Sequence, residues 1–300
     1  MNDLLYDSLT SPVLAGPNWR HELAARGWPR GSLPDQAVKA KPALVRQITD
    51  AAIDAGASFI LTNTESANAV TLQREIDSGQ IKIPDLPEIN RQAVSICLQA
   101  VSDAGNLPTL VVGVMGPSEQ LITLDEVKPE ALESAYAAQA EALVAGGANA
   151  IACRHFTELA ALLCAVKAAK RTDRPVIACL TFDSGVEMAE TALGVTIPQA
   201  CEALVEAGVD AIGCDDGENA DTMPSLIGAI RSLSKLPVWA SVAAGIPQWI
   251  DEEIVYPEKP QDFAARLGPI VRAGANILAT GAGASLEHLA AFAKTRRQKK

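Results

Sequence analysis

Apolar residues follow two alternating patterns along the chain. Short runs that are apolar at consecutive positions predict buried strands near 12–16, 58–63, 109–115, 149–154, 175–182, 210–215, 237–243 and 276–281. Between them, apolar residues recur every three or four positions, which predicts helices at 41–55, 88–105, 129–146, 157–171, 197–207, 219–233, 260–273 and 285–297. Strand and helix therefore alternate along the whole chain.

A glycine follows four of the predicted helices, at Gly56, Gly147, Gly208 and Gly274, and an apolar run begins a few residues later. Glycine suits the left-handed residue that often ends a helix. Eight strands, each followed by a helix, predict an α/β fold of the (β/α)8 TIM-barrel type, formed by residues 1–300 as a single domain. An open, doubly wound parallel sheet is the competing architecture.

Three connections between a strand and the next helix are long: residues 17–40 after strand one, 65–87 after strand two and 245–259 after strand seven. In a barrel these βα loops lie at the C-terminal ends of the strands, where active sites are built. We therefore expect the functional site to include them.

Composition and charge limit the partners. The net charge of −11 disfavours nucleic acid as a ligand, and no apolar stretch reaches the ~20 residues of a membrane span. The first residues do not resemble a secretion signal, which leads us to expect a cytoplasmic protein. The six cysteines are scattered without CxxC spacing, so a disulfide scaffold is disfavoured. These features favour a small-molecule substrate, and the alanine-rich outer helices are compatible with a homodimer.

Several stretches of the chain match a known family. They are residues 41–45, 55–64, 113–117, 175–185, 207–213 and 285–289. Together they resemble the homocysteine S-methyltransferases, which include betaine-homocysteine methyltransferase and the homocysteine-binding barrel of cobalamin-dependent methionine synthase. The resemblance implies methyl transfer to a small thiol or amino-acid-like substrate and a binding role for Thr62, Asn63 and Thr64. It is compatible with a folate, corrinoid, betaine or sulfonium methyl donor.

The chain departs from the family at its zinc and amine-binding positions. Family members bind zinc through one cysteine after strand six and an adjacent pair after strand eight, but Asp216, Gly281 and Ala282 stand there. Zinc is therefore not expected. The two carboxylates that hold the homocysteine amine in the family are replaced by Ala15 and Arg154.

Charged residues at the ends of strands four to six suggest a different pocket. Arg154 is suited to bind a carboxylate or phosphate, with Asp215 from two strands away as a further substrate-binding residue, while His155, Asp216 or Asp183 transfers a proton. The competing interpretation is an ion pair of Arg154 with Asp216 or Asp183 that only fills the former pocket.

Two metal sites are further alternatives. Asp183, Asp215, Asp216 and Glu218 could supply oxygen ligands to Mg²⁺ or Ca²⁺. A displaced zinc site of Cys153, Cys179 and Cys214 is disfavoured, because strand alternation directs Cys153 towards the helices.

Two functions remain open at this point. The first is a methyltransferase-family enzyme whose pocket is rebuilt around Arg154, His155, Asp215 and Asp216. The alternative is a non-catalytic ligand-binding or regulatory barrel that has lost methyl transfer. An open pocket at Arg154 and His155 would favour the enzyme, and a pocket closed by ion pairs would favour the alternative.

Overall fold

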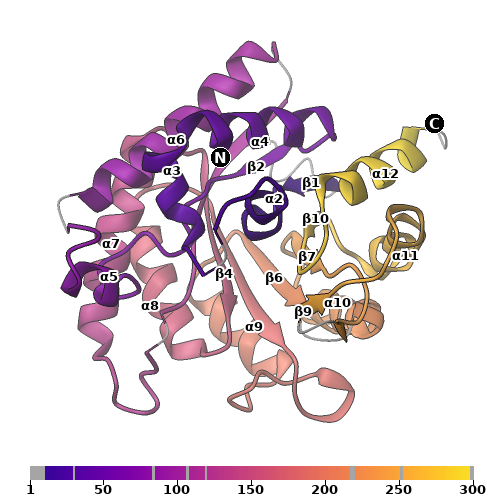
Figure 1. Cartoon of the computed structure of the whole chain (residues 1–300). Helices are drawn as coiled ribbons and strands as arrows, with labels where there is room; N and C mark the ends of the chain where they lie inside the picture. Colours follow the sequence, from indigo (N-terminus) through magenta and orange to yellow (C-terminus); the bar gives the residue numbers. More distant parts are fainter. Residues whose placement is uncertain are drawn as a thin grey trace.

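Eight parallel strands close into a barrel (Figure 1). The computed structural model describes residues 11–29, 31–82, 85–105, 108–118, 120–216, 220–250 and 253–297. Around the barrel the strands follow the order β1-β10-β7-β6-β5-β4-β3-β2, so each lies beside its neighbour in the sequence of barrel strands. They are β1 (Val13–Gly16), β2 (Phe59–Leu61), β3 (Leu110–Met115), β4 (Ala150–Phe156), β5 (Val176–Phe182), β6 (Ala211–Asp216), β7 (Val238–Val242) and β10 (Ile277–Thr280). The predicted (β/α)8 barrel is confirmed, and the open sheet is wrong.

Helices surround the barrel and connect its strands (Figure 1). The main ones are α4 (Pro42–Asp54), α6 (Leu86–Asp103), α7 (Pro129–Ala145), α8 (Leu159–Lys170), α9 (Ile197–Glu206), α10 (Met223–Leu233), α11 (Pro260–Ala273) and α12 (Leu286–Arg297). Each lies within a few residues of a predicted helix. At the end of two of them, Gly56 and Gly274 adopt φ values of 95° and 118°, the left-handed backbone that their glycines predict.

Strand alternation divides the hydrophobic core into two layers. Side chains such as Phe59, Val112 and Trp239 point into the barrel and fill it. Their neighbours along each strand, such as Ile60 and Val111, pack outward against the helices. Trp239 is the largest fully buried side chain. The interior is therefore solid, and a ligand can enter only at an end of the barrel.

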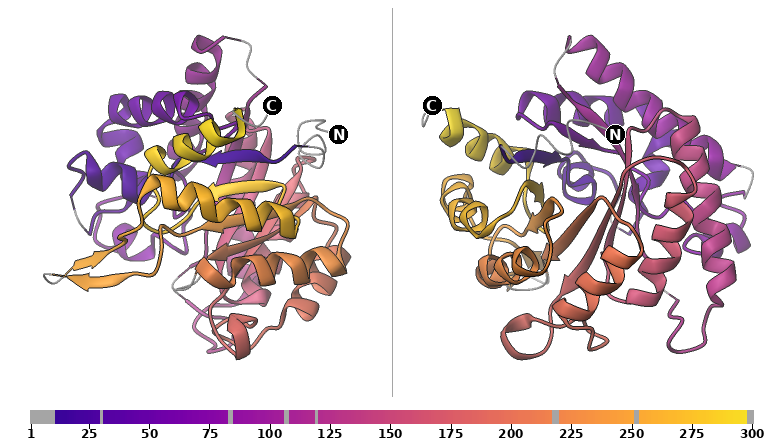
Figure 2. Two further views of the ribbon diagram at one scale, coloured as in Figure 1. Left: turned by 90° about the vertical axis from the view of Figure 1, so that its right-hand side faces the viewer. Right: turned by 180° about the vertical axis from the view of Figure 1, so that it is seen from behind.

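The three long connections contain short elements that the sequence pattern does not predict. After β1 come α2 (Trp19–Ala25), η1 (Pro34–Gln36) and α3 (Ala37–Ala40), and after β2 comes α5 (Gln73–Asp77). After β7 the chain forms an antiparallel hairpin of β8 (Gln248–Ile250) and β9 (Glu253–Val255), which projects from the barrel (Figure 2). The remaining short helices are η3 (Val186–Met188) and η4 (Ala220–Thr222). Among the described helices, none has the length and apolar character needed to span a bilayer.

Candidate functional site

A pocket of about 270 Å³ opens at the C-terminal ends of the strands. Its wall is formed by the ends of β2, β3, β4 and β10 together with the segments that follow β1, β2 and β10. Five of the residues that line it have ionisable side chains: Arg20, Asp35, Glu65, Arg154 and His155. Thr280 adds a hydroxyl. The pocket thus lies where a barrel of this type places its active site.

Arg154, at the end of β4, is 4% exposed and reaches into the top of the barrel interior. Its Nη2 donates to Asp215 Oδ1 at 2.8 Å and to Ser241 Oγ at 3.0 Å, and its Nε lies 3.3 Å from the same carboxylate oxygen. The guanidinium carbon lies 4.9 Å from the centroid of the Trp239 ring, in the range of a cation–π contact. Its Nη1 has no hydrogen-bond partner within the described part of the chain. One edge of the guanidinium is therefore fixed, while the residue still lines the pocket.

The buried ion pair of Arg154 with Asp215 differs from the competing interpretation of the sequence, in which Arg154 pairs with Asp216 or Asp183. Asp215 is fully buried, and its carboxylate contacts Arg154 inside the barrel. Burial alone would raise the pKa of Asp215, but the Arg154 and His155 charges outweigh it and hold that pKa below its usual value. Asp215 is thus a carboxylate that compensates a buried cation.

A bulge in β4 turns His155 to the same pocket as Arg154. The register with β5 shifts between Cys153 and Phe156, and His155 has a φ of 62°. Without the bulge, strict alternation would direct two consecutive side chains to opposite faces of the strand. The His155 backbone N donates to Asp215 Oδ2 at 2.6 Å, which fastens the bulge to the next strand but one.

The His155 ring contacts Glu65, which follows β2. Nδ1 lies 2.8 Å from Glu65 Oε1, and Nε2 lies 3.2 Å from Arg154 Nη2. Because Arg154 can only donate, these contacts fit a neutral ring with the proton on Nδ1 and a lone pair on Nε2. Burial lowers the pKa of His155, but the charges of the Glu65 and Asp215 carboxylates together raise it by more, so its pKa lies above the usual value. Gly116 makes this possible, since a Cβ there would lie 2.4 Å from Glu65 Cγ.

The polar side chains after β2 line the pocket, and they also connect β2 to β3 and to the first long loop. Thr64 Oγ1 donates to the Val114 carbonyl at 2.7 Å and accepts from Thr62 Oγ1 at 2.7 Å, while Thr62 Oγ1 accepts from Val114 N. Asn63 Nδ2 donates to the Pro34 carbonyl and so ties the first long loop to this strand. Their proposed role in substrate binding remains a prediction.

Two further pocket residues escaped the sequence interpretation. Thr280, at the end of β10, is 3% exposed, and its Oγ1 is a buried hydroxyl without a hydrogen-bond partner among the described residues. Asp35, in η1, is 2% exposed and accepts from Ser66 N at 2.9 Å. Thr280 was identifiable as a polar strand end. Asp35 lies in a loop whose course depends on tertiary contacts, and no sequence signal marks it.

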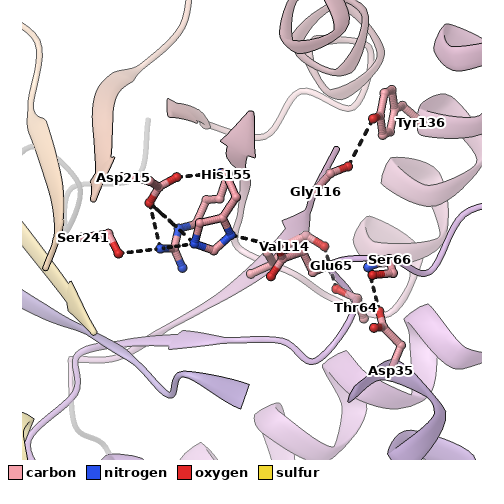
Figure 3. A network of polar contacts seen from close by, with 11 residues as sticks. Asp35, Thr64, Glu65, Ser66, Val114, Gly116, Tyr136, His155, Asp215 and Ser241 are labelled. Atoms are coloured by element: carbon pink, nitrogen blue, oxygen red, sulfur yellow. Dashed lines mark hydrogen bonds and ion pairs between the residues drawn. The ribbon is translucent and has the colours of Figure 1, made fainter. Parts of the chain in front are cut away.

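The polar residues of the site extend from one side of the pocket to the other (Figure 3). Asp215 and Ser241 lie at one side, Asp35 and Ser66 at the other, and His155 and Glu65 between them.

The other predicted acidic residues are placed differently. Asp183 is half-buried, accepts from Ser184 Oγ at 3.1 Å, and does not line the pocket. Asp216 ends β6 beside Phe182, but its side chain lies outside the described residues, as does all of Glu218. In the described part of the chain, no three His, Cys, Asp or Glu side chains are grouped so that they could hold a metal ion.

The residues present do not fit a three-thiolate zinc site. Gly281 and Ala282, at the positions that the resemblance matches to the cysteine pair, offer no ligand atom but line the pocket. Cys153 and Cys214 pack in the outer core, whereas Cys179 lies inside the barrel. Burial raises the pKa of the Cys153 thiol to about 12 and, with the Asp215 charge, raises that of Cys179 well above its usual value.

Comparison with known proteins places the chain among methyltransferases. A family model described as homocysteine S-methyltransferase matches residues 12–296. The methionine synthases of Mycobacterium tuberculosis and Mycobacterium leprae are each 27% identical to it over 259 residues, which is 83% of this chain but only 21% of theirs. The metallated form of the Escherichia coli homocysteine methyltransferase MmuM has the same fold, with a TM-score of 0.76, 17% identity and 95% of each chain covered. A methyltransferase from Methanosarcina mazei matches with a TM-score of 0.61 and 13% identity, over 99% of this chain and 97% of its own.

Proposed function

Because this chain belongs to the homocysteine S-methyltransferase family, we propose that it is an enzyme that transfers a methyl group to a small acceptor carrying a thiol and a carboxylate. This proposal rests on the hydrogen bonding of the Arg154 guanidinium. Its Nε and Nη2 are held by Asp215 and Ser241, whereas Nη1 has no partner in the described chain. A guanidinium fixed in this way is preorganised to bind a carboxylate.

The unpartnered hydroxyl of Thr280 supports the same substrate. Thr280 and Arg154 line one pocket, and a buried hydroxyl without a partner costs free energy that a ligand can recover. A carboxylate bound there would accept hydrogen bonds from both groups.

His155 is the group suited to accept the thiol proton. Its Nε2 lone pair faces Arg154 Nη2 at 3.2 Å and can take a proton when that contact opens on substrate binding, while Glu65 accepts a hydrogen bond from Nδ1, which orients the ring and favours proton uptake. In the proposed step the acceptor thiol gives its proton to Nε2, and the thiolate sulfur forms a bond to the methyl carbon. With a betaine or sulfonium donor, the carbon–nitrogen or carbon–sulfur bond breaks, and the electron pair leaves with the neutral amine or sulfide.

The proposal is tested by methyl transfer to matched thiols. Purified protein is incubated with 3-mercaptopropionate, or with cysteamine, which has an amine in place of the carboxylate, and with donors of each class. We expect S-methyl product from the carboxylate thiol and at least about tenfold less from cysteamine. Thr280→Val removes one hydroxyl without a change of shape and should raise KM for 3-mercaptopropionate with little effect on folding.

A pH profile tests the role of His155. Because Glu65 raises the pKa of His155, Glu65→Gln should move the acid limb of kcat/KM to lower pH. An unchanged acid limb would exclude His155 as the base.

The buried ion pair of Arg154 with Asp215 favours the second candidate, a non-catalytic binding barrel. Tight binding of the carboxylate thiol with no S-methyl product from any donor class would support that candidate and refute the first.

A further inference from the structure

A second cavity, of about 350 Å³, lies between the loops that follow β1 and β2. It is bounded by η1 and α3 on one side and by the segment after α5 and the start of α6 on the other. No residue lines both this cavity and the pocket that contains Arg154. We propose that this cavity binds the zwitterion of an apolar amino acid, as a second ligand outside the pocket of the proposed reaction.

One side of the cavity carries a charge of each sign. Lys39 Nζ lies 3.1 Å from Asp85 Oδ1, and the two side chains are 48% and 37% exposed. The hydrogen bond from Lys39 lowers the pKa of Asp85, which keeps that carboxylate charged at neutral pH. A lysine ammonium has three N–H donors and a carboxylate has about four lone-pair positions, so the pair can take further partners without separating. An amino acid can therefore place its carboxylate beside Lys39 and its ammonium beside Asp85.

The floor of the cavity is aliphatic. Ile81 and Ile89 line it and are only 7% and 2% exposed. Ile89 packs in a small cluster with Val38, Ala67 and Ala93, which joins α3, the loop after β2 and α6. An aliphatic side chain placed on these isoleucines leaves water, which favours binding.

Two primary amides complete the lining. Gln36 and Gln80 face the cavity from its two sides, and neither amide has a hydrogen-bond partner among the described residues. A primary amide both donates and accepts, so each can bind either end of a zwitterion. A cation, an anion, two amides and an aliphatic floor together match an amino acid better than a ligand of single charge.

The short helix η1 separates this cavity from the pocket of the proposed reaction. Its residue Asp35 lines that pocket, whereas the next residue, Gln36, lines the second cavity. The carbonyl of Pro34, at the start of η1, accepts from Asn63 Nδ2 and fixes the helix to the end of β2. An amino acid bound at Gln36 thus contacts the element that forms a wall of the other pocket.

Titration calorimetry with L-leucine tests the ligand class. We expect a Kd of about 1 mM or below. Binding should be at least about fivefold weaker for 4-methylpentanoate, which lacks the ammonium, and for 3-methylbutylamine, which lacks the carboxylate. Glycine, which lacks the aliphatic side chain, should bind at least about tenfold more weakly. Equal binding of leucine and either singly charged analogue would overturn the zwitterion site.

Substitutions at exposed positions test the location. Lys39→Gln and Asp85→Asn should each weaken leucine binding at least about fivefold. Arg91→Gln removes the cation of the exposed Arg91–Glu88 pair, which lies on α6 outside the cavity, and should keep the wild-type Kd as a matched control. Ala40→Phe places a ring in the cavity from the exposed end of α3, and should abolish leucine binding while Tm stays near that of wild type.

Competition separates the two cavities. The Kd of leucine should stay within about twofold in the presence of saturating 3-mercaptopropionate. Leucine binding that survives both Lys39→Gln and Ala40→Phe would place the amino acid elsewhere and overturn the second site, whether or not 3-mercaptopropionate binds. Absence of saturable leucine binding up to about 10 mM would overturn it as well.

Discussion

Replacing Asp35 by Asn should make the free protein more stable at alkaline pH. A carboxyl whose pKa rises from 3.8 to about 7 on folding contributes stability that is complete below pH 3.8 and is lost as the pH rises to about 7. This pKa shift of roughly three units means that the free energy of unfolding of the wild-type protein falls by at most roughly 4 kcal/mol as the pH rises. Asn keeps the acceptor for Ser66 N and carries no charge, so the variant escapes that loss.

Urea unfolding of both proteins at pH 5 and pH 8 measures the effect. Between these pH values the stability of the variant relative to wild type should grow by roughly 3 kcal/mol, because most of the wild-type loss falls in this range. Asp50→Asn, on the exposed side of α4, is the control and should change stability by at most about 1 kcal/mol at either pH. A difference between Asp35→Asn and wild type that is equal at both pH values would show that Asp35 ionises normally, and the buried-charge reasoning would be wrong.

Two further substitutions test the barrel interior. Arg154→Met leaves the Asp215 carboxylate unpaired and should lower the free energy of unfolding by roughly 3–5 kcal/mol, whereas adding Asp215→Asn should cost less than the sum of the single losses in urea unfolding. If the losses of the two single variants add up to that of the double variant, Arg154 and Asp215 do not stabilise each other. Gly213→Ala would place a Cβ 2.0 Å from Cys179 Sγ and should lower stability by roughly 1–3 kcal/mol. Gly228→Ala, in α10 with no atom within 4 Å of the new Cβ, should instead raise Tm slightly, and equal Tm values for the two variants would refute the packing argument.

The barrel was predictable because its signals are local. Apolar runs, helical spacing and the glycines after four of the helices are properties of short segments, and Gly56 and Gly274 adopt the backbone that this pattern requires. The first long loop was not predictable. It is held by contacts such as Asn18 Nδ2 with the Gly281 carbonyl, which join residues 263 positions apart. Such contacts leave no periodic trace in the sequence, so α2 and η1 appear only in the structure.

The sequence predicted Arg154 and His155 as pocket residues, but it did not predict Glu65, Asp35 or the contacts that link these charged groups. Arg154 enters the barrel interior, where a cation requires a buried partner, and Asp215 supplies it. The second oxygen of Asp215 binds the His155 backbone and holds the bulge that turns the ring towards Glu65. On the far wall, burial and then the charge of Glu65 raise the pKa of Asp35. A bulge has no clear signature in one sequence, and without it alternation would separate Arg154 from His155. The geometry of Arg154, Asp215, His155 and Glu65 is therefore set by their contacts with one another, which no single position in the sequence reveals.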